Sequence, residues 1–237
     1  MSNPWRLARV ELHFTPVPQA FANIERMPFL PEFETRILPV VVLDDAELAL
    51  PLAEALLEGG IDAMEITLRH ACAFDAISRV RAGLADMCVG AGTLTRPEDF
   101  GRVAEAGAKF AVSPGLTPAL AAAARASALP FIPGVMTPSE VIAAQEHGYF
   151  LLKLFPAGQV GGLAMLKALA SPFGGVRFCP TGGVSAETLK VFLQQPNVAL
   201  VGGSWLTPAD AIKTRDWKRV ARLAREASEI ARTAGTA

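Results

Sequence analysis

The chain has 237 residues, of which 51% are hydrophobic and 19% are charged, so it can fill the core of one large domain. Its net charge of −1 argues against the basic field expected of a protein that binds nucleic acid or an anionic membrane surface, and we expect a small-molecule partner. No stretch reaches the roughly 18 apolar residues of a membrane span. The N-terminus lacks the pattern of a signal peptide, so we expect a cytoplasmic protein.

The first 35 residues differ in composition from the rest of the chain. Five prolines are scattered among them and rule out one long helix. We expect residues 1–35 to form an irregular arm that packs on the following domain or on a neighbouring subunit. An alternative is that the native chain starts nearer Met27.

From Ile37 onward, short apolar or β-branched runs alternate with longer segments rich in Ala, Leu and Glu, which is typical of βα units and a parallel sheet. The predicted strands span residues 37–43, 63–67, 87–92, 109–113, 129–134, 150–155, 176–181 and 198–203. The helical segments between them include residues 47–58, 97–106, 138–147 and 186–194, several opened by a capping Thr, Ser or Asp, and a last helix is predicted over 217–231.

Eight such units predict a TIM (β/α)8 barrel over residues 36–237. A doubly wound open sheet is the competing architecture. However, no GxGxxG motif follows the first predicted strand, and we favour the barrel.

Lys153 interrupts the apolar run of residues 150–156, which otherwise predicts a buried strand. Burial disfavours the charged form of an amine, and a neutral lysine attacks ketones to form a Schiff base. The alternatives are a lysine at a strand end that extends its amine into solvent, or one paired with a buried carboxylate.

Glu65 is the candidate partner of Lys153. Period-two alternation places Glu65 on one face of its strand with Ala63 and Thr67, and we expect that face to line the barrel interior together with Lys153. Such a pair can transfer protons, although a structural ion pair is the alternative. Arg69, just past the strand, could bind a carboxylate through its planar guanidinium, or it could be an ordinary surface arginine.

Glycines end one predicted strand and form turns after two others. Gly-Ala-Gly-Thr at 90–93 allows close backbone approach and offers the hydroxyl of Thr93. The turns at 180–183 and 202–204 follow the last two strands, where TIM barrels usually bind phosphate. The alternative is that these glycines only form tight turns.

The sequence offers no arrangement typical of a metal site. Its three cysteines are far apart and unpaired by any CxxC motif, so we expect them to be small core residues in a reducing compartment. None of the histidines lies at metal-ligand spacing from another, and we expect no metal. His70 could reach the mouth of a barrel, or it could be a solvated loop residue.

Taken together, these residues resemble the 2-keto-3-deoxy-6-phosphogluconate (KDPG) aldolase family, which includes the 4-hydroxy-2-oxoglutarate (KHG) aldolases. Residues 60–69 and 148–161 carry the resemblance most specifically. Supporting motifs lie at 89–93, 113–117, 132–135, 177–183 and 202–205. Gly158 and His70 depart from the family pattern, which tends to have Glu at the first position and Thr or Ser at the second.

The resemblance implies a metal-independent class I aldolase of the Entner–Doudoroff pathway, usually a homotrimer, that cleaves KDPG to pyruvate and glyceraldehyde 3-phosphate without a cofactor. It implies that Lys153 forms the Schiff base, that Glu65 is the general acid and base, and that Arg69 and Thr93 hold the substrate carboxylate. It further implies a pocket lined by Pro114 and Phe155 and a phosphate site formed by Thr181, Gly182, Gly183, Gly203 and Ser204.

Several other functions stay open at this point. The same imine chemistry could cleave 4-hydroxy-2-oxoglutarate to pyruvate and glyoxylate or decarboxylate oxaloacetate. From another class, a non-catalytic phosphosugar-binding barrel could use Lys153 to neutralise a ligand carboxylate. A metal-dependent pyruvate aldolase is a third alternative, which the missing ligand cluster argues against.

Overall fold

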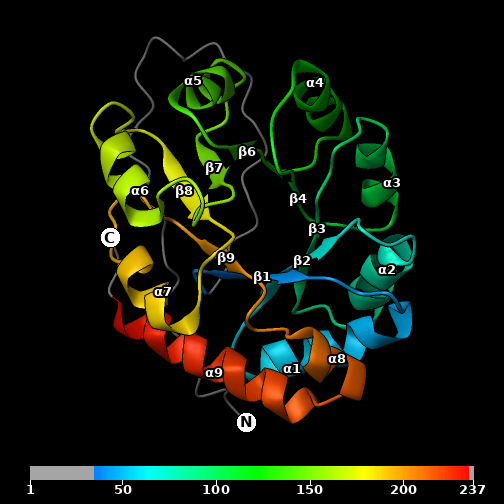
Figure 1. Ribbon diagram of the computed structural model, residues 1–237. Helices are drawn as coiled ribbons and strands as arrows, with labels where there is room; N and C mark the ends of the chain where they lie inside the picture. The colour runs from blue at the N-terminus through cyan, green and yellow to red at the C-terminus, as the bar shows by residue number, and fades with distance from the viewer. Residues whose placement is uncertain (1–34, 235–237) are drawn as a thin grey trace.

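The strands form a closed parallel barrel in the computed structural model, which describes residues 35–234 (Figure 1). The predicted arm therefore lies outside the described residues, apart from Thr35. The strands are β1 (Ile37–Val41), β2 (Ala63–Thr67), β3 (Cys88–Gly92), β4 (Ala111–Val112), β5 (Phe131–Ile132), β6 (Gly134–Val135), β7 (Leu151–Leu154), β8 (Arg177–Pro180) and β9 (Val201–Gly203).

Two features close the ring. The first sheet has the order β5-β4-β3-β2-β1-β9, the second has the order β6-β7-β8, and parallel bridges from Phe178 to Val198 and from Thr181 to Gly202 join β8 to β9. On the other side, β5 and β6 are the two halves of one strand interrupted at Pro133. The Ile132 carbonyl accepts from Ser113 next to β4, whereas the Pro133 carbonyl accepts from Lys153 on β7. The predicted barrel is thus confirmed, and the open doubly wound sheet is wrong.

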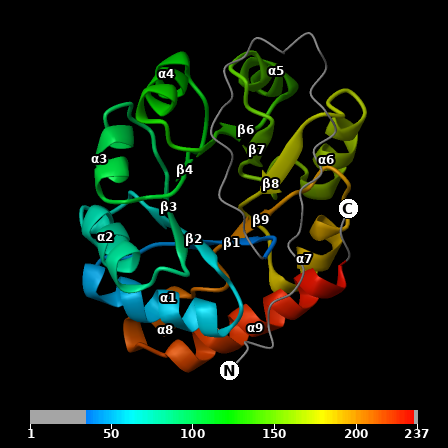
Figure 2. The same cartoon turned by 180° about the vertical axis from the view of Figure 1, so that it is seen from behind.

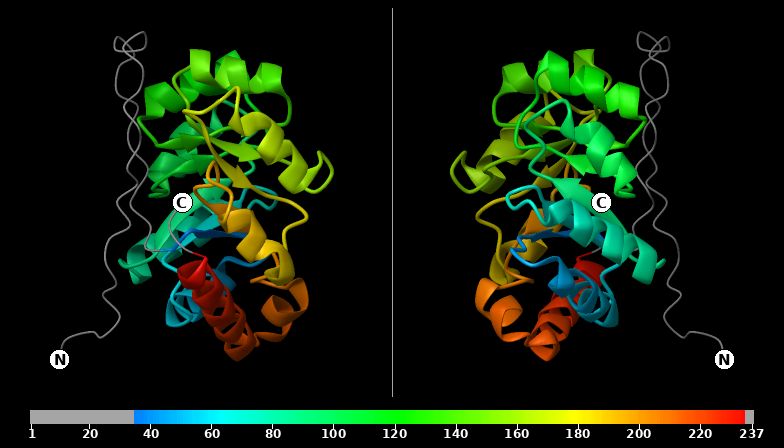
Figure 3. Two further views of the ribbon diagram at one scale, coloured as in Figure 1. Left: turned by 90° about the vertical axis from the view of Figure 1, so that its left-hand side faces the viewer. Right: turned by 90° about the vertical axis from the view of Figure 1, so that its right-hand side faces the viewer.

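Helices α1 to α7 surround the strands in chain order, and α9 packs between α7 and α1, as Figures 1 and 2 show from opposite sides. In side view, α9 lies at the same edge of the ring as α1, with α4 and α5 at the opposite edge (Figure 3). A 3-10 turn, η2 (Ala46–Leu48), precedes the first helix. The helices are α1 (Ala49–Glu58), α2 (Ala73–Gly83), α3 (Asp99–Glu105), α4 (Pro118–Ser127), α5 (Pro138–Glu146), α6 (Gly162–Ala170), α7 (Ala186–Leu193), α8 (Ala209–Thr214) and α9 (Trp217–Thr233).

Local sequence signals set several helix starts. Thr117 and Thr137 each precede a proline and accept a hydrogen bond from a backbone N–H of the first turn, so they cap α4 and α5. Glu140 completes a capping box by accepting from the Thr137 backbone N–H at 2.8 Å. The expectation that Thr and Ser residues open helices is confirmed at these positions.

Element boundaries differ from the predictions. The strand predicted over 109–113 is reduced to Ala111–Val112, and the strand predicted over 129–134 is split at Pro133, which has no N–H to donate to a ladder. The helix predicted from residue 47 begins at Ala49, because Asp45 caps a 3-10 turn first.

Apolar side chains fill both faces of the barrel wall. Most of the core lies between strands and helices, and a separate cluster fills the interior of the ring. The interior cluster comprises Leu38, Ala63, Phe110, Val112, Ile132, Cys179, Ala199 and Leu200. Ala63 precedes Glu65 by one inward-facing position, so this cluster forms a dry floor on the N-terminal side of the polar residues described next.

Within residues 35–234, no helix is long and apolar enough to cross a membrane.

Candidate active site

An ion pair between Lys153 and Glu65 lies inside the barrel. The Lys153 Nζ atom is 2.9 Å from Glu65 Oε1, and the side chains are 7% and 1% exposed. Lys153 comes from β7 and Glu65 from β2, so the closed ring brings together residues 88 positions apart. Because buried ion pairs are often no more stabilising than apolar side chains, this one calls for a reason other than stability.

Glu65 has a second oxygen without a partner. Oε2 is buried and receives no hydrogen bond from the part of the chain that the structure describes. Leaving such an atom unsatisfied is costly, so it indicates a place where a water molecule or a ligand hydroxyl binds.

Gly92 provides the space that the Glu65 carboxylate occupies. A Cβ atom at position 92 would lie 3.0 Å from Glu65 Cδ, and 3.2 and 3.3 Å from the two carboxylate oxygens. The preceding inward glycine, Gly90, makes room in the same way for the ring of Phe110. The sequence indicates only close backbone approach at these glycines and not the side chains that pack over them, because no local signal marks a contact across strands.

Phe155 and Pro114 lie on the strands and loops around the pair. The Phe155 ring centroid is 5.4 Å from Lys153 Nζ. Pro114 follows β4 and is held against β6, where a Cβ on Gly134 would overlap the Pro114 backbone. The Ser113 hydroxyl strengthens this junction, since it donates to the Gly115 carbonyl at 2.5 Å and accepts from the Gly134 N–H at 3.4 Å.

Arg69 and Thr93 follow neighbouring strand ends. Thr67 of β2 pairs with Gly92 of β3, and the Leu68 N–H donates to the Gly92 carbonyl at 2.8 Å, so the next residues of both strands lie at the same rim. The Arg69 side chain is exposed and forms no ion pair within residues 35–234, which leaves its guanidinium available for an anion. Thr93 has a φ of 64°, a left-handed conformation that is rare for a β-branched residue.

The loops after β8 and β9 lie side by side, because Thr181 bridges to Gly202. Gly182 and Gly183 have φ values of 88° and 83°, which side chains other than glycine rarely adopt. Ser204 is exposed at the end of β9. The structure therefore brings the predicted phosphate-binding residues to one end of the barrel.

Packing explains part of this glycine pattern. A Cβ on Gly202 would overlap the Thr181 hydroxyl, and a Cβ on Gly203 would overlap the Trp205 ring. Gly202 and Gly203 lie on β9 and not in a turn, so packing is the reason for these two glycines. The positive φ values of Gly182 and Gly183 suit a tight turn, so the alternative that they only form a turn stays open beside phosphate binding.

Gly158 braces the loop after β8. Its N–H donates to the Gly182 carbonyl at 2.8 Å, and the Ala157 N–H donates to the Thr181 carbonyl at 2.8 Å. A Cβ on Gly183 would lie 3.0 Å from the Gly158 Cα atom, so the two loops meet backbone to backbone. His70, which like Gly158 departs from the family pattern, is exposed on the loop after β2.

Cys179 lies in the interior floor close to the ion pair. Burial raises the pKa of its thiol to about 12, with opposing contributions from Lys153 and Glu65. The thiol is therefore protonated at neutral pH and does not compete with Lys153 as a nucleophile. The expectation of core cysteines holds for Cys179, whereas Cys72 and Cys88 are partly exposed.

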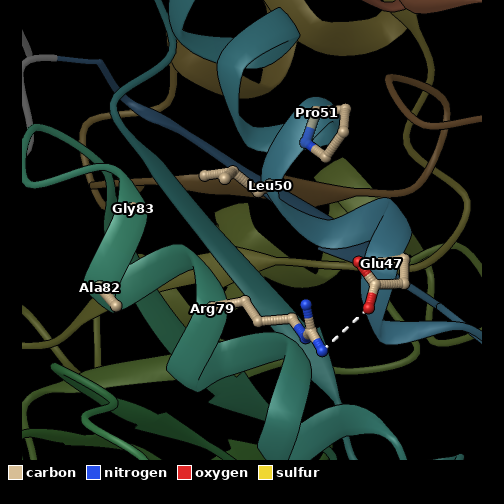
Figure 4. Close-up of a pocket in the computed structure, with 6 residues that line it drawn as sticks. All are labelled: Glu47, Leu50, Pro51, Arg79, Ala82 and Gly83. Carbon is tan, nitrogen blue, oxygen red and sulfur yellow. Dashed lines mark ion pairs between the residues drawn. The ribbon is translucent and has the colours of Figure 1, made fainter.

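No group of three His, Cys, Asp or Glu residues within 35–234 is arranged to hold a metal ion. A surface groove of about 470 Å³ is lined by residues of η2, α1 and α2 (Figure 4), and the buried ion pair is not part of its lining. Arg79 and Glu47 pair at 2.9 Å along its edge, and both are well exposed. Because its charged groups satisfy each other in solvent, this groove is a poorer candidate for chemistry than the barrel interior.

Comparisons with known proteins agree with the geometry. The family described as KDPG and KHG aldolase matches residues 32–223. A 2-dehydro-3-deoxy-phosphogluconate aldolase of Dickeya dadantii is 46% identical over 191 residues, covering 81% of this chain and 90% of its own. A KHG/KDPG aldolase of Escherichia coli K12 is 45% identical over 196 residues, covering 83% and 92%.

Solved structures give the same result. The KDPG aldolase of Legionella pneumophila, with pyruvate captured as a covalent carbinolamine intermediate, superposes with a TM-score of 0.80 at 44% identity, covering 82% of this chain and 94% of its own. The Zymomonas mobilis enzyme with 3-phosphoglycerate has a TM-score of 0.80 at 40% identity, covering 86% and 95%.

Proposed function

The chain belongs to the KDPG and KHG aldolase family, and from that membership we propose that it is a class I aldolase that cleaves KDPG to pyruvate and glyceraldehyde 3-phosphate. The observation that carries the proposal is the buried pair of Lys153 and Glu65, 2.9 Å apart, with one oxygen of Glu65 that no residue of 35–234 bonds. An amine and a carboxylate at this distance can exchange a proton directly.

In the first half of the reaction, Glu65 takes a proton from the Lys153 ammonium, and the resulting amine attacks the C2 ketone of the substrate. Glu65 then returns the proton to the hydroxyl of the carbinolamine, which leaves as water to give a protonated imine, and this imine withdraws electrons from the bond between C3 and C4. Glu65 removes the proton of the C4 hydroxyl, directly or through one water molecule at Oε2, and the bond breaks to release glyceraldehyde 3-phosphate.

In the second half, the pyruvate enamine takes a proton from Glu65 at C3 and returns to the imine. Hydrolysis then releases pyruvate and regenerates Lys153. Glu65 acts as a base in cleavage and as an acid in reprotonation. Its carboxyl group must therefore contact both Lys153 and the substrate. The two oxygens of Glu65, one paired and one free, are suited to this division.

The remaining site residues bind the two ends of the substrate. Arg69 and Thr93 hold the carboxylate of the pyruvate half, and Pro114 and Phe155 line the pocket beside the reacting carbons. The phosphate at the other end binds to the loops after β8 and β9, through Thr181, Gly182, Gly183, Gly203 and Ser204. The exposed guanidinium of Arg69, which forms no ion pair with residues 35–234, and the left-handed glycines support these assignments.

A second activity has its own support. The Escherichia coli relative at 45% identity is a KHG/KDPG aldolase, so we include cleavage of 4-hydroxy-2-oxoglutarate by the same residues. We further propose that the enzyme acts without a cofactor other than the covalent bond to Lys153, and that it is a cytoplasmic homotrimer.

The test is to incubate the protein with pyruvate and sodium borohydride, which reduces an imine to a stable amine. Peptide mass spectrometry should find a pyruvyl adduct on Lys153 that is absent in Lys153→Arg. A folded protein without the adduct would contradict the imine mechanism and favour a binding barrel. Loss of aldolase activity in EDTA would instead favour the metal-dependent alternative.

A further inference from the structure

The loop between β3 and α3 ends in a buried acidic residue. Asp99 begins α3, and its side chain is only 4% exposed. The Arg96 guanidinium donates to both carboxylate oxygens, from Nε to Oδ2 at 3.1 Å and from Nη2 to Oδ1 at 2.9 Å. Arg102 adds a third hydrogen bond to Oδ1 at 3.3 Å. Both carboxylate oxygens are therefore hydrogen-bonded, and Arg96 holds the group in the two-point geometry that lysine cannot reproduce.

This cluster ties the loop to two helices. Arg102 lies on α3, and its guanidinium carbon is 3.9 Å from the ring centroid of Phe74 on α2. Arg96 lies within the loop itself, three residues before Asp99. The far end of the loop is thus attached to the packed helices through the buried Asp99, while the Arg96 and Arg102 side chains are 59% and 53% exposed.

The near end of the loop is fixed by the barrel. Leu94 is fully buried, and its N–H donates to the Val112 carbonyl of β4 at 3.1 Å. Thr93 lies immediately before it with a φ of 64°. A β-branched residue keeps such a conformation only where its surroundings hold it on both sides, because it would otherwise relax.

We propose that Arg96 and Asp99 are positioning residues that keep Thr93 in the conformation from which it binds the carboxylate of the pyruvate half of the substrate. This inference rests on the function proposed above, specifically on the role of Thr93. Neither residue touches the substrate. They act by fixing the far end of a short loop whose near end is already held by Leu94.

A purely structural role predicts something different. A carboxylate in the first turn of a helix stabilises that helix through the dipole, which would account for Asp99 on α3. The dipole does not require Arg96, whose two-point contact lies outside the helix. The two explanations therefore separate when Arg96 is changed and Asp99 is kept.

The experiment compares Arg96→Gln with Glu98→Gln in the full chain. Glu98 is an exposed neighbour, 3.8 Å from Arg96, and its substitution disturbs the charge of the same loop without removing the bonds to Asp99. The readout is the pyruvate concentration that gives half-maximal borohydride trapping on Lys153. We expect Arg96→Gln to raise this half-maximal pyruvate concentration about three- to tenfold. That is less than the complete loss of a hydrogen bond to a charged group would cause, because the Thr93 hydroxyl is still present. Glu98→Gln should leave the concentration unchanged.

A double-mutant comparison tests whether the effect passes through Thr93. In a Thr93→Ala background, Arg96→Gln should no longer raise the half-saturating concentration, since the group it positions is gone. The midpoint of urea unfolding, measured on every variant, reports the structural contribution separately. Should Arg96→Gln fail to fold, Arg96→Lys serves instead, because lysine keeps the charge but not the two-point contact.

The inference is overturned if Arg96→Gln binds pyruvate like the wild type, or if its effect is the same with and without the Thr93 hydroxyl. A wild-type protein that forms no adduct on Lys153 would contradict the proposed function itself. Trapping in the wild type with no change in the variants would contradict only the role of Arg96 and Asp99.

Discussion

The contact between Gly92 and Glu65 predicts that adding one methyl group will damage catalysis. In Gly92→Ala, the new Cβ would lie 3.0 Å from Glu65 Cδ, whereas ordinary van der Waals contact begins near 3.4 Å. Gly92 does not have a positive φ, so alanine meets no backbone strain and acts only by contact. The Glu65 carboxylate must therefore move by a few tenths of an ångström, away from its position 2.9 Å from Lys153.

The size of the effect follows from this displacement. Misplacing a reacting group by about 1 Å can cost on the order of a hundredfold in rate, and a smaller shift of the base should lower kcat/KM by about tenfold or more. Inserting a methyl group into a closely packed interior should also lower the free energy of unfolding by about 1–3 kcal/mol. Because the displaced group is the acid and base, the loss should fall mainly on kcat.

The assay couples pyruvate release to its reduction and follows kcat and KM with KDPG, alongside urea unfolding. Gly101→Ala is the matched control, since position 101 on α3 has no atom within 4 Å of a new Cβ. That variant should keep wild-type kcat/KM, and its free energy of unfolding should rise by about 0.5–1 kcal/mol because alanine favours a helix more than glycine does. A Gly92→Ala enzyme with wild-type kcat/KM would refute the reasoning.

Three further predictions concern the phosphate site, the interior thiol and the N-terminal end of the barrel. Ser204→Ala should raise KM for KDPG far more than KM for 4-hydroxy-2-oxoglutarate in parallel steady-state assays, and equal losses on both would contradict a phosphate contact. Iodoacetamide at pH 8 should leave Cys179 unmodified in the native protein and label it in urea, by peptide mass spectrometry, since the native thiol is buried with a pKa of about 12. Because burial raises that pKa from 9.0 to about 12, the protonated thiol contributes its full stability below about pH 9, and this contribution is lost as the pH rises towards 12. The free energy of unfolding of Cys179→Ala should therefore fall less steeply between about pH 9 and 12 than that of the wild type. Arg36→Met removes hydrogen bonds to the carbonyls of Leu193, Val198 and Ala199, so its free energy of unfolding should fall by about 1–3 kcal/mol while kcat per folded molecule stays unchanged.

Much of the fold was predictable because its signals are local. The alternation of apolar runs with amphipathic segments marks the strands and helices, and period-two patterning is enough to place Glu65 and Lys153 on inward faces. The less predictable features arise from contacts between segments. The division of one strand at Pro133 depends on which neighbour each half meets, and the short β4 depends on where its partners end.

Some features of the candidate site can likewise be predicted from the sequence, and others only from contacts between segments. A lysine inside an apolar run, an acidic residue on an alternating strand and paired glycine turns are visible in the chain itself, because each is unusual for its local environment. Only the tertiary structure shows that Gly92 makes room for Glu65 and that Gly158 braces the glycines after β8.

The order of apolar and polar side chains along the chain is enough to predict the barrel class and the chemical types of the site residues, since burial and strand periodicity follow from it. Tertiary packing sets which groups meet: the 2.9 Å pair across the ring, the second Glu65 oxygen that no described residue bonds, and the place of Gly92 beside that carboxylate. These depend on distances between residues remote in sequence, which are fixed only when the ring closes and its loops pack against the helices.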